Sequence, residues 1–216
     1  MGRKARLSRE MILEAAWWIL DTSGIGAVTI KSVAEALGCS TQPISWHFGS
    51  MTEMKKALWA YAAFRLYGSL EEEMKKMDAV GAFLYSGIRY ISNACDHPRV
   101  FRFLNIDDPL ETVGEEMRGE KSIFSTQMDE FAVRMLSETY RVSPERIGEA
   151  VQNTVIYTHG LAVMMMWDRY RLDKGKACRM IFEIGTRMLR DAGIRMNREE
   201  MVRWQSMIPG SADAES

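Results

Sequence analysis

The chain has 216 residues, of which 47% are hydrophobic, and its formal net charge is -1. That length and composition allow one or two domains with a true core, and they exclude a disordered chain or a small disulfide-stapled scaffold. The near-neutral charge gives no global sign of nucleic-acid binding. A basic arm nevertheless precedes the first predicted helix: Arg3, Lys4, Arg6 and Arg9. Such an arm is a local electrostatic footprint that the average conceals, although a solvated polar leader explains it nearly as well.

Cysteine usage and hydropathy favour a cytoplasmic protein without membrane association. Cys39, Cys95 and Cys178 are odd in number, widely spaced and form no CxxC pair, which indicates a reducing compartment. No secretory leader pattern opens the chain, and its longest apolar run, GLAVMMMW, is shorter than the ~20 residues that a membrane span requires.

Helical spacing of apolar residues begins near the N-terminus. The stripe within residues 12–20 predicts a first helix, with Ser8 as its N-cap and Gly24 just past its end. Thr29 caps a predicted short second helix that ends at Gly38. Two short helices joined by a tight turn containing glycine would form a helix-turn-helix motif, whose second helix is offered to DNA.

That second, recognition helix is predicted to begin with Ser40 as its cap and to hold Pro43 in its first turn, where a missing amide is harmless. Ile44 and Phe48 point one way on it, as buried anchors. The other face suits base edges, thymine methyls and phosphates. It carries Gln42, Pro43, Ser45 and Trp46, with His47 at its boundary. Packing of Trp46 against the fourth helix is an equal alternative for this face.

Helices also dominate the remainder of the chain. The capping box SMTE opens a fourth helix, predicted from Ser50 to about Met77. Further helices are predicted on both sides of His97-Pro98, over residues 122–140, over residues 144–170 and over residues 174–192, whereas residues 106–121 read as an acidic loop. The last helix carries one apolar stripe: Cys178, Ile181, Phe182, Gly185, Met188 and Leu189. Two adjacent apolar helices, one with small residues, are suited to a bundle between two chains.

The segment ILEAAWWILDTSGIGAVTIKSVAEALGCSTQPISWHFGSMTEMKKAL resembles, over its whole length, the DNA-binding domain of the TetR family of bacterial transcriptional regulators. The resemblance rests on an ordered set of features: a helix ending in Asp-x-x-Gly, then VTIKSVAEALG, then a recognition helix closing in aromatic, His, Phe, and a capped fourth helix. The C-terminal half is similar in layout and in two short pieces, DHPRVFRFL and YTHGLAV.

The resemblance implies an all-α fold: an N-terminal three-helix helix-turn-helix DNA-binding domain plus a C-terminal helical ligand-binding and dimerisation domain. We accordingly divide the chain into residues 1–50 (helix-turn-helix domain with its basic arm), 51–77 (connecting helix), 78–207 (ligand-binding and dimerisation domain) and 208–216 (disordered tail). The resemblance further implies a repressor that binds a near-palindromic duplex operator as a homodimer and is released by a small-molecule effector.

Carried over residue by residue, the family pattern marks a set of DNA-binding positions. With the basic arm, they are Arg3, Lys4, Arg6, Thr29, Lys31, Thr41, Gln42, Pro43, Ser45, Trp46 and His47. Two positions depart from the pattern, because Ser45 stands where the family usually has Tyr, and Met51 where it usually has Lys. The affinity for DNA would then depend more on the arm and on Lys55 or Lys56. The same departures support an alternative, a helical ligand-binding or scaffold protein with impaired DNA binding.

Methionine and aromatic side chains in the C-terminal half are first of all core candidates, and also candidates for an adaptable apolar ligand pocket. They are Phe101, Phe103, Phe131, Met135, Tyr157, Met164 and Trp167, together with His159, which is more often a satisfied core histidine than a ligand contact. An enzyme is not expected, because Ser45 and His47 point in different directions on one short helix and no third orienting acid is apparent. We expect no cofactor and no metal, since the three histidines lack ligand spacing and no phosphate-binding loop is present.

Overall fold

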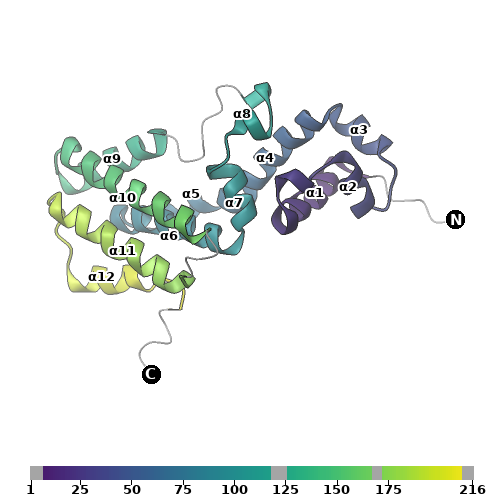
Figure 1. The fold of residues 1–216 in the computed structure, drawn as a ribbon. Coiled ribbons are helices and arrows are strands. Elements are labelled where there is room, and N and C mark those ends of the chain that lie inside the picture. Colours follow the sequence, from purple (N-terminus) through teal and green to yellow (C-terminus); the bar gives the residue numbers. More distant parts are fainter. Residues whose placement is uncertain (1–6, 118–125, 167–171, 211–216) are drawn as a thin grey trace. The chain divides into compact units, whose positions relative to one another are not determined.

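The computed structural model describes residues 7–117, 126–166 and 172–210, and the regular elements in these ranges are all helices (Figure 1). The prediction of an all-α fold is therefore confirmed. The chain forms two compact units: residues 1–68 with 97–123, and residues 69–96 with 124–216. None of the helices in the described ranges combines the length and hydropathy needed to cross a bilayer.

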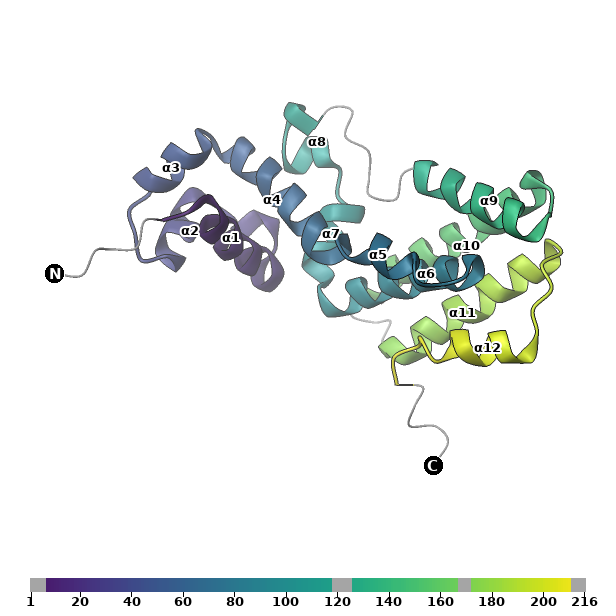
Figure 2. The same cartoon turned by 180° about the vertical axis from the view of Figure 1, so that it is seen from behind.

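The first unit contains the N-terminal helices and a returning segment. Its elements are α1 (Arg9–Ser23), η1 (Ile25–Ala27), α2 (Ile30–Ala36), α3 (Gln42–Phe48), α4 (Met51–Tyr67), α7 (Pro98–Asn105), α8 (Pro109–Thr112) and η2 (Glu115–Met117). Ile12, Ala16 and Leu20 of α1 are fully buried, as their spacing predicts. They join Leu58 of α4 and Phe103 of α7 in one hydrophobic core. Figure 2 shows α1, α2 and α3 of this unit from behind.

Side-chain caps begin α1, α2 and α4 where the sequence predicts. The Ser8 hydroxyl accepts the Met11 amide, and the Thr29 hydroxyl accepts the Ser32 amide, so each satisfies a donor that the helix cannot. The cap predicted at Ser40 is wrong. The N-cap of α3 is Thr41, whose own backbone is already helical and whose side chain makes no capping bond.

The fourth helix is shorter than predicted. α4 ends at Tyr67, and a separate helix α5 (Leu70–Met74) follows in the second unit. The break falls at Gly68, the residue type with the lowest helix propensity after proline. At that position an added Cβ would lie 2.5 Å from the Phe64 carbonyl oxygen, so the backbone there is closed to larger residues. The prediction of a continuous helix from Ser50 to Met77 is therefore wrong.

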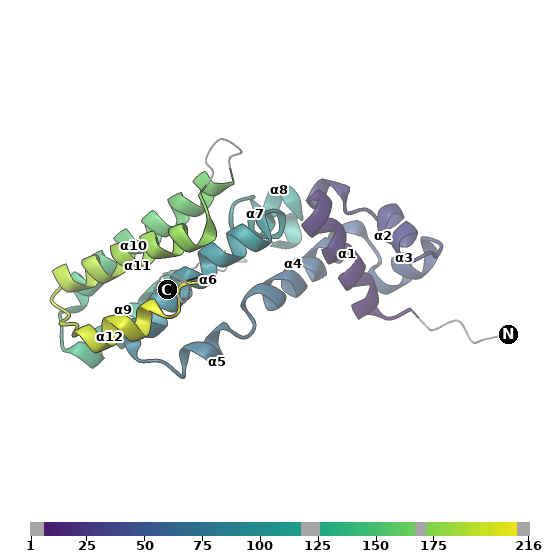
Figure 3. The same ribbon diagram turned by 90° about the horizontal axis from the view of Figure 1, so that it is seen from below.

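The second unit is built around α6 (Ala79–Asp96), which is buried along most of its length. Packed on it are α5, α9 (Thr126–Tyr140), α10 (Pro144–Met165) and α11 (Lys174–Asp191). Figure 3 shows α10 and α11 side by side. The predicted continuation of α10 over residues 167–170 and the predicted start of α9 over residues 122–125 lie outside the described residues.

The apolar stripe of α11 faces α6 inside the chain. Cys178, Ile181, Phe182, Gly185 and Leu189 are buried, and an added Cβ at Gly185 would lie 2.7 Å from Leu84. The close approach that Gly185 allows is therefore to α6 of the same chain. Met188 alone of the stripe is half-exposed.

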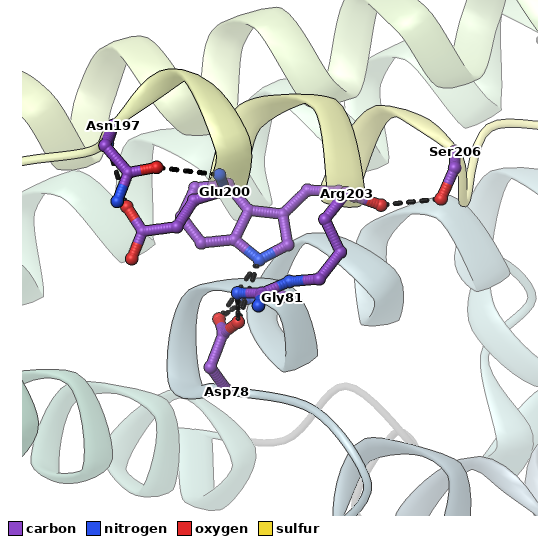
Figure 4. Close-up of polar contacts among 7 residues, drawn as sticks. Asp78, Gly81, Asn197, Glu200, Arg203 and Ser206 are labelled. Atoms are coloured by element: carbon purple, nitrogen blue, oxygen red, sulfur yellow. Dashed lines mark hydrogen bonds and ion pairs between the residues drawn. The ribbon is translucent and has the colours of Figure 1, made fainter.

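A final helix, α12 (Arg198–Gln205), was not predicted, and one acidic residue holds it to α6 (Figure 4). Asp78 accepts a hydrogen bond from the Gly81 amide at the start of α6, at 2.8 Å. The same carboxylate accepts the indole N–H of Trp204, 3.0 Å from its Oδ2, and pairs with Arg203. Because Trp204 is 2% exposed, its ring is part of the core of this unit. Ile208, inside the predicted tail, is also buried, and residues 211–216 lie outside the described range.

Candidate nucleic-acid interface

The turn between α2 and α3 is set by one glycine. Gly38 has a φ of 61°, in the left-handed region that other residues adopt at a cost. Its amide donates to the Glu35 carbonyl at 3.1 Å, and the Cys39 amide donates to the Ala34 carbonyl at 3.0 Å. These two bonds close a Schellman motif and satisfy the free carbonyls at the end of α2. The chain is thereby redirected into α3, and the predicted helix-turn-helix is present.

One face of α3 is anchored in the core and the other is open. Ile44 and Phe48 are 0% and 6% exposed, as predicted for the anchors. Trp46 is 75% exposed, so the alternative in which it packs against the fourth helix is wrong. Thr41, Gln42 and Ser45 are also exposed, and Pro43 is half-buried. An amide, two hydroxyls and an indole therefore lie free on one short helix, the chemistry that base edges and phosphates require.

His47 holds the N-terminal segment beside the recognition helix. Its Nε2 lies 3.0 Å from the Leu7 carbonyl oxygen, and its own carbonyl accepts a hydrogen bond from Arg9 at 3.2 Å. The Arg9 guanidinium also stacks 4.3 Å from the centre of the Phe48 ring. This pairing of Arg9 with α3 was not predicted, because a separation of 38 residues leaves no local signal for it.

The two predicted contact residues of α2 differ in availability. The Lys31 side chain is 83% exposed and makes a long ion pair, 3.8 Å, with Glu35. Because such a surface pair is worth little, the ammonium is available to a phosphate. The Thr29 hydroxyl instead caps α2 and donates to Ser32 Oγ at 3.0 Å. Thr29 thus caps the start of α2, at an exposed position.

Lys55 makes a hydrogen bond to another element of the first unit. Its ammonium donates to the Thr112 carbonyl at 3.0 Å, at the C-terminal end of α8, and the side chain is half-buried. Met51, in place of the usual lysine, is half-buried too and packs against the hydrophobic core. Arg3, Lys4 and Arg6 of the basic arm lie outside the described residues.

The predicted pocket residues are not gathered at one site. Phe101 and Phe103 are fully buried on α7 of the first unit. Phe131 on α9 and Tyr157 and Met164 on α10 are exposed at 49%, 37% and 37%, and Met135 is half-buried. Trp167 lies outside the described range.

His159 is on an exposed position of α10 rather than in a core. Its Nδ1 is nevertheless 2.7 Å from the hydroxyl of the buried Tyr90. From its exposed position, His159 thus provides a hydrogen-bond partner for the Tyr90 hydroxyl of α6. In the described part of the chain, no group of histidine, cysteine and acidic side chains could hold a metal ion.

Two short helices are joined by a turn at Gly38, and the second exposes a polar face. This arrangement is that of a helix-turn-helix DNA-binding protein. Residues 12–58 match the family described as "Bacterial regulatory proteins, tetR family". The N-terminal domain of this chain is thus similar to the DNA-binding domain of the TetR family of transcriptional regulators, and the match covers residues 12–58. A comparison with curated proteins gives no match.

Solved structures of several regulators share the fold of most of the chain. AmtR of Mycobacterium smegmatis aligns with 94% of this chain and 95% of its own, at 17% identity and a TM-score of 0.57. RolR in complex with its ligand resorcinol aligns with 94% of this chain and 93% of its own, at 17% identity and a TM-score of 0.56. A transcriptional regulator from Rhodococcus sp. Rha1 aligns with 88% of this chain and 100% of its own, at 13% identity and a TM-score of 0.56. At these identities the likeness concerns the fold.

Proposed function

We propose that this protein is a cytoplasmic repressor that binds a near-palindromic operator as a homodimer and leaves it when a small molecule binds. The observation that carries the proposal is α3, which is anchored by Ile44 and Phe48 and leaves Gln42 and Trp46 free at the surface. Two features support regulation by a ligand: the second helical unit, and the likeness of the fold to a regulator solved with resorcinol.

The DNA-reading part comprises α3, Lys31 and the arm. Leu7 is held at the end of α3 by His47, so the described part of the chain begins beside the recognition helix. Lys31 and the arm then contact phosphates, and Gln42 reads a base edge in the major groove. Thr41, Pro43 and Ser45 complete the base-facing surface.

The homodimer is assigned to the outer face of α10 and α11. Ile156, Tyr157, Gly160 and Met164 share the exposed side of α10. Half-exposed Met180, Ile184 and Met188 recur every fourth residue on α11. Met188 lines a shallow hollow with Asn153, one turn before Tyr157, so the two rows adjoin. An apolar surface of this kind on two neighbouring helices is suited to a four-helix interface between two chains.

Two-fold symmetry fixes the operator geometry. Two copies of α3 related by one axis require half-sites about one helical turn apart, ~34 Å or somewhat more. An effector that prefers the DNA-incompetent arrangement by ~3 kcal/mol weakens operator binding more than a hundredfold. By reciprocity, operator DNA weakens effector binding by the same factor.

The test uses the full chain and its own upstream DNA. We expect a gel shift by a dimeric species, with a near-palindromic footprint, and its release by a metabolite that raises the melting temperature. Sedimentation that finds only monomer at micromolar concentration would remove the dimer. A dimer that binds ligands but shifts neither this DNA nor a random duplex library would favour the alternative, a ligand-binding protein with impaired DNA binding.

A further inference from the structure

A groove of about 570 Å³ lies between α9 and α10 in the second unit. That volume falls within the ~300–1,000 Å³ typical of small-molecule sites. Its walls include Val133, Ser137 and Glu138 of α9 and Pro144, Gly148 and Val151 of α10. Neither the residues of the proposed dimer face nor the aromatic and methionine residues predicted to line a pocket belong to it.

Ser137 in this groove has an unsatisfied hydroxyl. The residue is 8% exposed, and in the described part of the chain its Oγ has no hydrogen-bond partner. Buried helical hydroxyls in the same unit return to the carbonyl four residues earlier: Thr154 to Ala150 at 2.8 Å and Thr158 to Thr154 at 2.7 Å. Since buried polar groups are normally paired, the Ser137 hydroxyl is set to bond something that enters the groove.

The charges beside the groove are unequal. Glu130, Arg134 and Glu138 line it at intervals of four residues, so all three lie on one side of α9. With two carboxylates and one guanidinium, the α9 side of the groove has a net negative charge, which favours the binding of a cation. Val133 of α9, with Pro144 and Val151 of α10, provides apolar surface for the body of a ligand.

We propose that the groove between α9 and α10 binds a small amphipathic amine. The apolar body lies on Val133 and Val151, the Ser137 hydroxyl hydrogen-bonds to the ligand, and the ammonium group faces Glu130 and Glu138. Binding at this site does not depend on the proposed repressor function. Only its consequence for the operator rests on that function.

Gly148 allows the groove to be filled without disturbing the fold. An added Cβ at this position meets nothing within 4 Å. Gly148→Leu therefore places a side chain in the ligand's space, whereas Gly148→Ala makes the same helix-favouring backbone change and fills little of it. Glu138→Gln removes a carboxylate from the groove, and Glu183→Gln removes one from an exposed position of α11 as its matched control.

Isothermal titration of the full chain with phenethylamine tests the proposal, with hydrocinnamate as a probe of opposite charge and a similar apolar body. We expect phenethylamine to bind more tightly than hydrocinnamate, and Gly148→Leu to weaken it at least tenfold while Gly148→Ala does not. Ser137→Ala should weaken it roughly threefold to tenfold, the effect of one net hydrogen bond. Glu138→Gln should weaken it and Glu183→Gln should not.

Three results would overturn the proposal: equal or tighter binding of hydrocinnamate, no binding of phenethylamine, or binding that is unchanged in Gly148→Leu. A gel shift with phenethylamine present is read separately. If the amine binds in the groove and operator affinity is unchanged, the site stands and its role in releasing the repressor is wrong.

Discussion

We propose that single residues of α3 and α2 have different roles in binding DNA. The exposed Gln42 amide can donate and accept at a base edge, whereas the Lys31 ammonium is a charge on a flexible, 83% exposed stem. Trp46 adds an exposed aromatic surface, and His47 is used within the chain to hold Leu7. Specificity and electrostatic affinity are therefore expected to respond to different substitutions.

We predict that Gln42→Ala alters which operator is preferred, with a loss of about 1–3 kcal/mol on the cognate site. Lys31→Ala, or alanine at Arg3, Lys4 and Arg6 together, should weaken binding to all duplexes and flatten its salt dependence, because fewer counterions are released. Affinities for cognate and scrambled duplexes over a salt series measure both effects. Equal loss on the two duplexes in Gln42→Ala would refute base readout by that residue.

Glu73 links α5 to α6 through a dense polar cluster. Its carboxylate accepts hydrogen bonds from Tyr85 and from Arg89, the latter at 2.5 Å. The bond from Tyr85, followed by that from Arg89, lowers the pKa of Glu73 from 4.5 to about 2. Burial raises the pKa of the Tyr85 hydroxyl, the partner in this pair. The ionised carboxylate is thus the form that the folded unit favours.

The pH dependence follows from that shift. A depressed folded pKa contributes stability that is present above pH 4.5 and is lost as the pH falls toward about 2. We predict that Glu73→Gln reduces the free energy of unfolding at pH 7 and makes it less dependent on pH between these limits. Denaturant unfolding at a series of pH values checks this. A variant whose acid sensitivity equals that of the parent would show that Glu73 does not contribute to it.

At the scale of the element, the turn between α2 and α3 depends on backbone conformation alone. Gly38 has open space around an added Cβ, so a larger residue there would suffer only from the positive φ. Gly26, in the same unit, also has open space and is not in that region. The two glycines therefore form a matched pair that separates strain from steric contact.

We predict that Gly38→Ala lowers the free energy of unfolding by about 1–2 kcal/mol, the cost of a left-handed residue with a Cβ. Gly26→Ala should change it by no more than ~0.5 kcal/mol. Urea unfolding at a fixed protein concentration compares them, and operator affinity of the folded variants shows whether α3 keeps its orientation. Equal effects of the two substitutions would mean that the φ of Gly38 is not what the turn requires.

How far the sequence predicts the structure differs between elements. The recognition helix follows from local signals: Ile44 and Phe48 at helical spacing, Pro43 in the first turn, and Gly38 in the turn before it. The orientation of the α11 stripe does not follow from local signals. The spacing of apolar residues predicts which face of a helix is buried, but not which partner covers that face. For the same reason, the sequence did not show that Phe103, a candidate for the ligand pocket, packs in the core of the first unit. Helix α12 was missed because Trp204 and Asp78 are 126 residues apart.

At the scale of the whole molecule, assembly is proposed to use the outer face of α10 and α11, while the groove for an amine lies on the other side of α10. In α10, Gly148 lines the groove and Gly160 lies among the exposed apolar residues. An added Cβ at either glycine meets nothing within 4 Å, so both faces can be altered without clashes inside the chain.

We predict that Gly160→Glu weakens dimerisation at least ~30-fold, because a carboxylate without a partner would be desolvated between the chains. Gln205→Glu, at an exposed position of α12, adds the same charge elsewhere and should leave the dimer intact. Sedimentation over a concentration series measures both. If Gly160→Glu dimerises as the parent does, the interface lies on another face.

The exposed indole of Trp46 also makes the recognition helix its own optical reporter. An indole in contact with water emits at long wavelength, and insertion against a sugar or a base removes that water. Trp46 is 75% exposed on α3, Trp18 is 61% exposed on α1, and Trp204 is 2% exposed. Of these three, only Trp46 lies on the recognition helix, so its emission should respond to the operator. Titration of the unlabelled protein with DNA should therefore shift its fluorescence to shorter wavelength, and Trp46→Phe should abolish the shift. Occupancy of the operator could then be followed in solution without modifying either partner.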